Sequence, residues 1–374
     1  MNPLDELRAV RPAHLDPERP VDPRTREAEL AGAFAHPREV GRARRGKRPL
    51  VWGLGRAAPV TAAAVVTGVL PGAIGGPPGP QRSTAAKPSA TRTVPLSAKQ
   101  VLLVAATSAE RQPATNGRFW HTKTRQITLQ HVDQGFVVSI ESENDSWVSV
   151  KDQWHTYRDL GAKPATPADQ QAYERLGSPK EVTFGKGKKQ LPISVTGRKP
   201  FTDHFTSKEV YWLGRNITLA DLEKLPGEPG ALKAELLRFY HGTSTESDAP
   251  MSKDAWLFAV TSGLITDMPV TPEVRGAAFR MLAALPSVTS LGQVTDAAGR
   301  TGTAIGIETP SQTTDDSKGV MQDRLIIDEQ AGSALAREGV VVEPGGYQAG
   351  LERGTVWNST TVLESAWTDD RTTG

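Results

Sequence analysis

The sequence lacks cysteine entirely and has almost no excess of either charge, with 44 basic and 42 acidic residues among 374. The first absence excludes a disulfide framework, thiol catalysis and a zinc–thiolate site. The second argues against a dedicated nucleic-acid-binding protein, which would carry a broad basic surface. Neither absence decides the compartment, because a large extracytoplasmic domain can fold without disulfides.

Complete catalytic and metal-binding motifs are also missing. The seven histidines include no H-x-x-x-H pair, and the chain contains no G-x-S-x-G segment and no complete phosphate-loop pattern. The acidic stretch ESENDS, residues 141–146, lacks the spacing of a calcium loop and is interpreted as a solvated turn. The stretch FGKGKKQ, residues 184–190, is interpreted as a flexible charged loop. We therefore expect no enzyme activity, no cofactor and no metal site.

The segment from Ala57 to Gly76 contains 20 consecutive residues without a charge. A helix of that length is about 30 Å long, which matches the hydrocarbon core of a bilayer. Basic residues are denser before the segment than after it, so the positive-inside rule places the N-terminus in the cytoplasm. The residues expected to fix this topology and anchor the span are Arg42, Arg44, Arg45, Lys47, Arg48, Trp52 and Arg56. The alternative is an Ala/Pro linker, because strongly apolar side chains are few in the segment.

Composition divides the chain into four parts. They are a basic cytoplasmic tail at 1–48, a transmembrane helix region at 49–76, a flexible Pro/Ser/Thr linker at 77–96 and an extracytoplasmic domain at 97–374. Ser97 followed by Gln100 is typical of a capping box and marks the start of the domain. The chain is thus expected to be a single-pass protein of the cell membrane with its C-terminal domain outside.

Within the domain, the sequence pattern predicts the order helix, strands, helices, strands. Thr271 and Pro272 begin the clearest helix. Residues 288–308 and 322–343 are each typical of a hairpin with an Asp/Gly-rich turn, and residues 208–219 are read as one strand-like piece. Because strands and helices are segregated along the chain, we predict an α+β fold with an antiparallel sheet.

Stretches spread over nearly the whole chain carry a family resemblance. They include GRFWHTKT at 117–124, RDLGAKPATPADQQAYERLGSP at 158–179, DMPVTPEVRGAAFRMLAALPSV at 267–288 and RLIIDEQAGSALARE at 324–338. The chain resembles a large, largely uncharacterised actinobacterial family of single-pass membrane proteins, often found beside extracytoplasmic-function sigma factors. The outer domains of that family are similar to the lipoprotein-carrier and sigma-regulator fold. The resemblance therefore implies a curved, half-barrel-like antiparallel sheet packed on helices.

Tryptophan is the residue type that offers a candidate site. The residues predicted to line an apolar groove, or else to fill the core, are Trp120, Trp147, Trp154, Trp212 and Trp256. We expect a membrane-anchored extracytoplasmic sensor or binding protein, linked to envelope signalling or sigma-factor regulation. The alternative is a tethered carrier that holds the acyl chains of a lipid or lipoprotein in an apolar groove. The expected partners are membrane lipid at the span and a protein or an apolar ligand at the outer domain, and no nucleic acid.

Overall fold

The computed structural model describes residues 96–185, 190–245, 249–311 and 318–371. All of the described residues belong to one compact unit. The predicted basic tail, the predicted transmembrane region and nearly all of the predicted linker lie outside the described residues. So do all seven residues expected to fix the topology and anchor the span.

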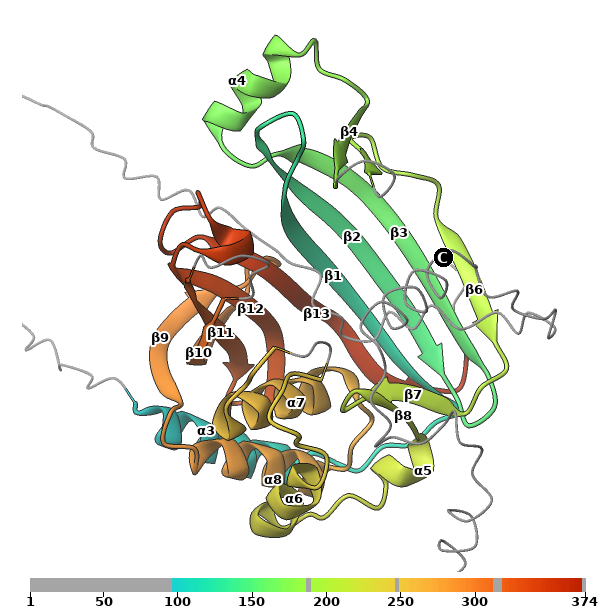
Figure 1. Ribbon diagram of the computed structural model, residues 1–374. Coiled ribbons are helices and arrows are strands. Elements are labelled where there is room, and N and C mark those ends of the chain that lie inside the picture. The colour runs from blue at the N-terminus through green and yellow to red at the C-terminus, as the bar shows by residue number, and fades with distance from the viewer. Residues whose placement is uncertain (1–95, 186–189, 246–248, 312–317, 372–374) are drawn as a thin grey trace, which may run out of the picture. The chain divides into compact units, whose positions relative to one another are not determined.

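Nine strands form one antiparallel sheet in the order β6-β3-β2-β1-β13-β12-β11-β10-β9 (Figure 1). The strands are β1 (Phe119–His131), β2 (Val137–Val148), β3 (Gln153–Pro164), β6 (Phe201–Phe205), β9 (Thr289–Thr295), β10 (Thr301–Pro310), β11 (Val320–Asp328), β12 (Ser333–Glu343) and β13 (Val356–Thr368). Strand β13 pairs with β1 on one side and with β12 on the other. The last strand therefore joins an early group of strands to a late one.

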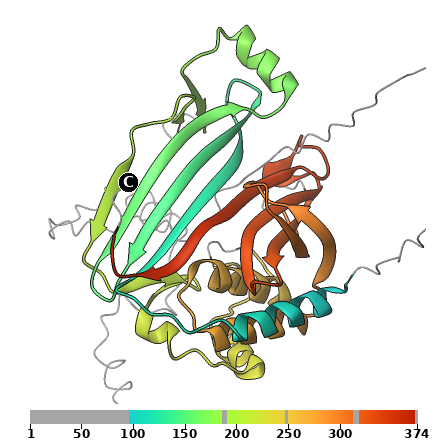
Figure 2. The ribbon, with the colours of Figure 1, turned by 180° about the vertical axis from the view of Figure 1, so that it is seen from behind.

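Helices and two short hairpins complete the described residues. The helices are α3 (Ala98–Glu110), α4 (Pro167–Arg175), α5 (Leu219–Leu222), α6 (Pro229–Leu237), α7 (Lys253–Asp267) and α8 (Pro272–Ala283), with the 3-10 turn η3 (Gly346–Gln348). The hairpins are β4 (Glu181–Phe184) with β5 (Leu191–Ser194), and β7 (Glu209–Trp212) with β8 (Arg215–Thr218). Seen from behind, α4 and the β4–β5 hairpin lie at the opposite end of the long strands from α3 and α6–α8 (Figure 2).

Local sequence signals start the three helices α3, α4 and α8, and at α3 and α8 they do so where we predicted. At α3, the Ser97 hydroxyl accepts a hydrogen bond from the Gln100 backbone N–H at 3.3 Å. The Gln100 side-chain oxygen accepts in turn from the Ser97 backbone N–H at 2.9 Å, which completes the capping box. The hydroxyls of Thr166 and Thr271 cap α4 and α8, and a proline follows each at the first helical position.

Helix α7 lies at the centre of the main hydrophobic core, and 11 of its 15 residues are buried. Helices α3 and α8 pack closely against each other beside it, and Gly276 lies where they meet. A Cβ atom at Gly276 would lie 2.4 Å from Cγ of Glu110, so only glycine fits there without a shift. Arg280 donates to both carboxylate oxygens of Glu110, at 2.9 and 2.7 Å, across the same contact.

The predicted fold class is wrong and needs correction. The described residues form mostly a nine-stranded antiparallel sheet with a few helices, and none of those helices is long and apolar enough to cross a membrane. The longest of them, α7, has 15 residues and is about 22 Å long, whereas a span needs about 20 residues. The predictions of a transmembrane helix, of a single-pass protein and of a cell-membrane location with an outer C-terminal domain are corrected with it.

Two local predictions are also wrong. Residues 208–219 form the hairpin β7–β8 instead of one strand, because Leu213 and Gly214 both adopt positive φ, at 58° and 71°. Two such residues in succession make the tight turn that suits the twist of a hairpin.

The predicted acidic turn, residues 141–146, lies inside strand β2. Its charges are paired across the sheet. Lys163 Nζ lies 2.6 Å from Glu141 Oε1, and Arg125 Nη2 lies 2.8 Å from Glu143 Oε1. Because the basic partners belong to β3 and β1, the stretch read by itself looks like a solvated turn.

Candidate functional site

Strand register determines which side chains share the face of the sheet that packs on helix α7. We call this the inner face. Directly opposed residues share a face, and the pairs Gln126–Thr360, Thr128–Asn358 and Gln126–Ser142 all belong to it. On β10 and β11 the same face carries core residues that pack on the helices. Over β1, β2 and β3 the helices do not cover it, so a hollow is left there.

The larger hollow is a cavity of about 1230 Å³ that is open to solvent, and we call it the wide groove. It runs across the sheet from β6 and β3 to β10, and the β4–β5 hairpin and the turn η3 contribute to its walls. Its large apolar and aromatic side chains are Leu129, Ile140, Tyr157, Phe184, Leu191, Ile193, Phe201, Met321, Tyr347 and Trp357. Leu191 and Phe201 are among the few large apolar side chains that are strongly exposed. The groove thus offers apolar surface that the chain itself leaves uncovered.

The wall formed by the β4–β5 hairpin is held against β3 by a close backbone contact. The Ala162 N–H donates to the carbonyl of Val195 at 3.3 Å. A Cβ atom on Gly161 would lie 2.5 Å from the same carbonyl oxygen, and Gly161 has φ of +95°. Both features require glycine at this position. Arg198 adds an ion pair to this wall, with Nε 3.9 Å from Asp159 Oδ2.

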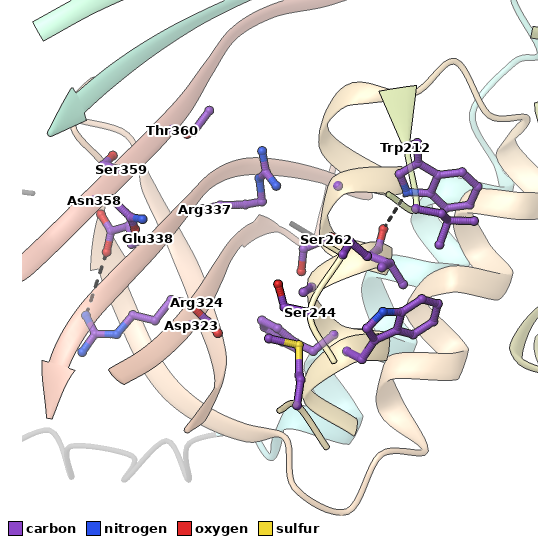
Figure 3. Close-up of a pocket in the computed structure, with 18 of the residues that line it drawn as sticks. Trp212, Ser244, Ser262, Asp323, Arg324, Arg337, Glu338, Asn358, Ser359 and Thr360 are labelled. Atoms are coloured by element: carbon purple, nitrogen blue, oxygen red, sulfur yellow. Dashed lines mark hydrogen bonds and ion pairs between the residues drawn. The ribbon is translucent and has the colours of Figure 1, made fainter. Parts of the chain in front are cut away.

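A smaller cavity of about 180 Å³ continues from the wide groove toward α7, and we call it the polar pocket. The two cavities share four lining residues: Gln126, Thr128, Asp323 and Asn358. Figure 3 shows the polar pocket between the strands and α7, with Arg337 extending from β12 toward the helix. Because the lining is shared, the groove and the pocket form one continuous depression on the inner face.

Charged side chains around the polar pocket are present in compensating pairs. Arg337 Nη2 lies 3.2 Å from Asp267 Oδ2, at the end of α7. Burial raises the pKa of Asp267, and the charge of Arg337 opposes that rise. Arg324 Nη1 lies 3.9 Å from Glu338 Oε2 on the other side of the strands (Figure 3). Burial raises the pKa of Glu338 to about 7, against the opposing charge of Arg324.

The five candidate tryptophans do not gather in one place. Trp120 lies on the inner face and donates from Nε1 to the carbonyl of Asp267 at 2.9 Å. Trp212 and Trp256 are buried, both line the polar pocket, and Trp212 Nε1 donates to the carbonyl of Val260 at 3.0 Å.

The remaining two, Trp147 and Trp154, oppose each other on the outer face of the sheet. The imidazole of His121 stacks on Trp147 with ring centroids 4.5 Å apart, and that of His204 stacks on Trp154 at 4.3 Å. His121 Nε2 lies 2.7 Å from a carboxylate oxygen of Asp145. The outer face therefore carries two stacked ring pairs, which together extend over four strands and are separate from the groove.

Sequence reasoning missed the polar residues of the inner face. On β1, uncharged polar side chains occupy alternate positions at Thr122, Thr124, Gln126, Thr128 and Gln130. A strand that faces an ordinary core carries apolar side chains at these positions, so this alternation was the available signal. The partner residues on β13 lie more than 200 positions further along the chain, and only the fold brings them together.

Among the described residues, no group of three histidine, aspartate or glutamate side chains is placed to hold a metal ion. No protein-family model, curated protein or solved structure matches the chain. The family resemblance that the sequence motifs suggest stays a prediction.

Proposed function

We propose that this domain binds an amphipathic molecule and that the apolar chain of that molecule occupies the wide groove. The observation that carries the proposal is the cavity of about 1230 Å³ lined by ten large apolar or aromatic side chains. Ligand pockets for small molecules commonly measure about 300–1,000 Å³ and combine an apolar lining with a few polar groups. A groove above that range suits a long, flexible chain better than a compact molecule.

The solvent exposure of the lining side chains indicates that the groove is a ligand site and not merely a packing defect. Side chains of Leu191 and Phe201 are about half exposed, at 54% and 48%. Each would lose contact with water when a ligand chain covers it, with a gain of about 25 cal/mol per Å² of apolar surface buried. The surrounding strands are hydrogen-bonded along their length, so a ligand would meet a largely preformed site.

The hypotheses of a sensor and of a carrier both require a bound ligand, and the groove supports that shared requirement. They differ in what happens after binding, because a carrier releases its ligand to an acceptor while a sensor changes its contact with a partner. Envelope signalling and a protein partner stay part of the sensor hypothesis.

The test uses the purified full chain and the uncharged apolar dye 1-N-phenylnaphthylamine, whose fluorescence rises in an apolar site. We expect saturable binding. We also expect Leu191→Glu to weaken it about tenfold or more, because the new carboxylate would be desolvated by the dye. Leu176→Glu is the matched control, since Leu176 is 49% exposed and lies outside the groove lining. Absence of saturable binding, or equal loss in the two variants, would remove the proposal.

A further inference from the structure

The inner face carries a row of four polar side chains where the wide groove meets the polar pocket. Gln126 and Thr128 on β1 oppose Thr360 and Asn358 on β13, and all four line the polar pocket. The structure records no hydrogen bond from any of these four side chains to another described residue. Amide and hydroxyl groups each donate and accept, so the row offers hydrogen bonds in both directions.

Two further polar atoms complete this set from the opposite wall and from β12. The hydroxyl of Ser262, on α7, is buried and has no hydrogen-bond partner among the described residues. The same holds for Nε of Arg337, whose neighbour across the strands is Thr360. Buried polar groups without partners are uncommon and cost stability, so each such group calls for an explanation. One such explanation is a ligand that supplies the missing hydrogen-bond partners.

The charges of the pocket decide the kind of ligand head. Four charged residues contribute to the lining, but only Asp323 and Arg337 lie on the inner face, whereas Arg324 and Glu338 lie on the outer face of the strands. Arg337 faces Asp267, Arg324 faces Glu338, and Asp323 accepts a hydrogen bond from the Thr309 hydroxyl at 3.2 Å. An anionic head would lose its hydration without gaining an uncompensated positive charge, and a cationic head would meet only Asp323, whose carboxylate already accepts from Thr309. An uncharged head that both donates and accepts hydrogen bonds loses much less hydration free energy when it enters the pocket.

We propose that the polar pocket binds the uncharged, hydroxyl-bearing head of an amphiphile whose apolar chain lies in the wide groove. This inference rests on the proposed function and adds the chemical class of the head. Hydroxyl groups match the lining because, like the Thr, Ser, Asn and Gln side chains there, each donates and accepts. The four shared lining residues place head and chain in one continuous site.

The first experiment measures displacement of 1-N-phenylnaphthylamine from the full chain by three amphiphiles with the same twelve-carbon chain, each below its micelle concentration. The heads are glucoside (uncharged), phosphate (anionic) and trimethylammonium (cationic). We expect dodecyl glucoside to compete about tenfold more strongly than either charged molecule. Equal competition by all three, or stronger competition by a charged one, would overturn the inference and leave the proposed function standing. Failure of the dye itself to bind would instead remove the proposed function.

The second experiment uses a matched pair of variants on α7. Ser262→Ala removes the unpartnered hydroxyl that lines the pocket. Thr261→Val removes the neighbouring hydroxyl, which is equally buried and unpartnered but does not line the pocket. Removal of an unsatisfied buried hydroxyl does not threaten folding, so both variants should keep or raise the melting temperature.

We expect Ser262→Ala to weaken competition by dodecyl glucoside about 3- to 10-fold, the usual range for one net hydrogen bond. Its dye affinity should equal that of the unmodified chain, because the dye has no head to place in the pocket. Thr261→Val should change neither value. An unchanged affinity for dodecyl glucoside in Ser262→Ala, or the same loss in Thr261→Val, would refute the head-group site.

Discussion

The ion pair between Arg337 and Asp267 gives the most quantitative prediction. The side chain of Arg337 is 22% exposed and that of Asp267 is 18% exposed, and the two face each other at 3.2 Å. Arg337→Met keeps much of the side-chain volume and leaves Asp267 without a counter-charge. Breaking a buried pair in this way costs about 3–5 kcal/mol of unfolding free energy. With an unfolding entropy of about 2.1 cal/mol/K for each folded residue, that corresponds to a drop of about 5–9 °C in melting temperature for a domain of this size.

The pH dependence of the same variant follows from the raised pKa of Asp267. Without the charge of Arg337, only a hydrogen bond with the Thr266 side chain opposes the effect of burial, so the pKa of Asp267 in the folded state should lie still higher. The folded state then holds a proton that the unfolded state releases, and unfolding free energy falls as pH rises between the two pKa values. Arg337→Met should therefore recover part of its lost stability when the pH is lowered from 7 to 5.

Urea unfolding followed by tryptophan fluorescence at pH 7 and pH 5 measures both effects. The double variant Arg337→Met/Asp267→Leu is the control, because replacing a buried pair with apolar side chains is often neutral or stabilising. A loss below about 1 kcal/mol in the single variant would show that Asp267 is solvated. An equal loss at both pH values would show that the buried carboxylate does not govern the effect.

Three further predictions concern the core, the titration of a buried carboxylate and the groove wall. Met281→Ala should cost about 2–5 kcal/mol, because the side chain is 1% exposed between helices; a melting curve like that of the unmodified chain would contradict its position. The pKa of Glu338 is raised to about 7, so its ionisation should lower the unfolding free energy by on the order of 3 kcal/mol as pH rises from about 4.5 to 7. In urea unfolding, Glu338→Gln should remove this loss between the two pH values, and pH profiles identical to those of the unmodified chain would refute the raised pKa. Gly161→Ala should lower the unfolding free energy by about 1–3 kcal/mol and weaken dye binding, because its Cβ would collide with the Val195 carbonyl in the wall of the groove. Dye binding equal to that of the unmodified chain would show that binding does not need the wall formed by the β4–β5 hairpin.

The parts of the fold that depend on short-range signals could be predicted from the sequence. The capping residues Ser97 and Thr271 begin helices, and both predicted hairpins in the C-terminal part form as β9–β10 and β11–β12. These features are set by residues that are close in sequence, through side-chain caps and tight turns. The sequence therefore predicted a helix start or a hairpin correctly where the contact that determines it joins residues only a few positions apart.

The errors arose where the deciding contact is distant in the chain. Residues 141–146 read as a turn because their acidic side chains find basic partners only on neighbouring strands. The predicted span was judged from its uncharged length and from the basic residues before it, and none of the described helices is long and apolar enough to cross a membrane. The polar row needed the pairing of β1 with β13, which no local pattern contains.

The place of β13 between β1 and β12 has a consequence for synthesis of the chain. Residues such as Thr128 and Asn358 pair although most of the domain separates them in sequence, so closing the sheet is a slow, non-local step. Until Val356–Thr368 leaves the ribosome, β1 and β12 each present an unpaired edge, which is a template for aggregation. A nascent chain that lacks this strand would expose two unpaired strand edges at the same time. Translation of β13 is thus the event that pairs both of these edges.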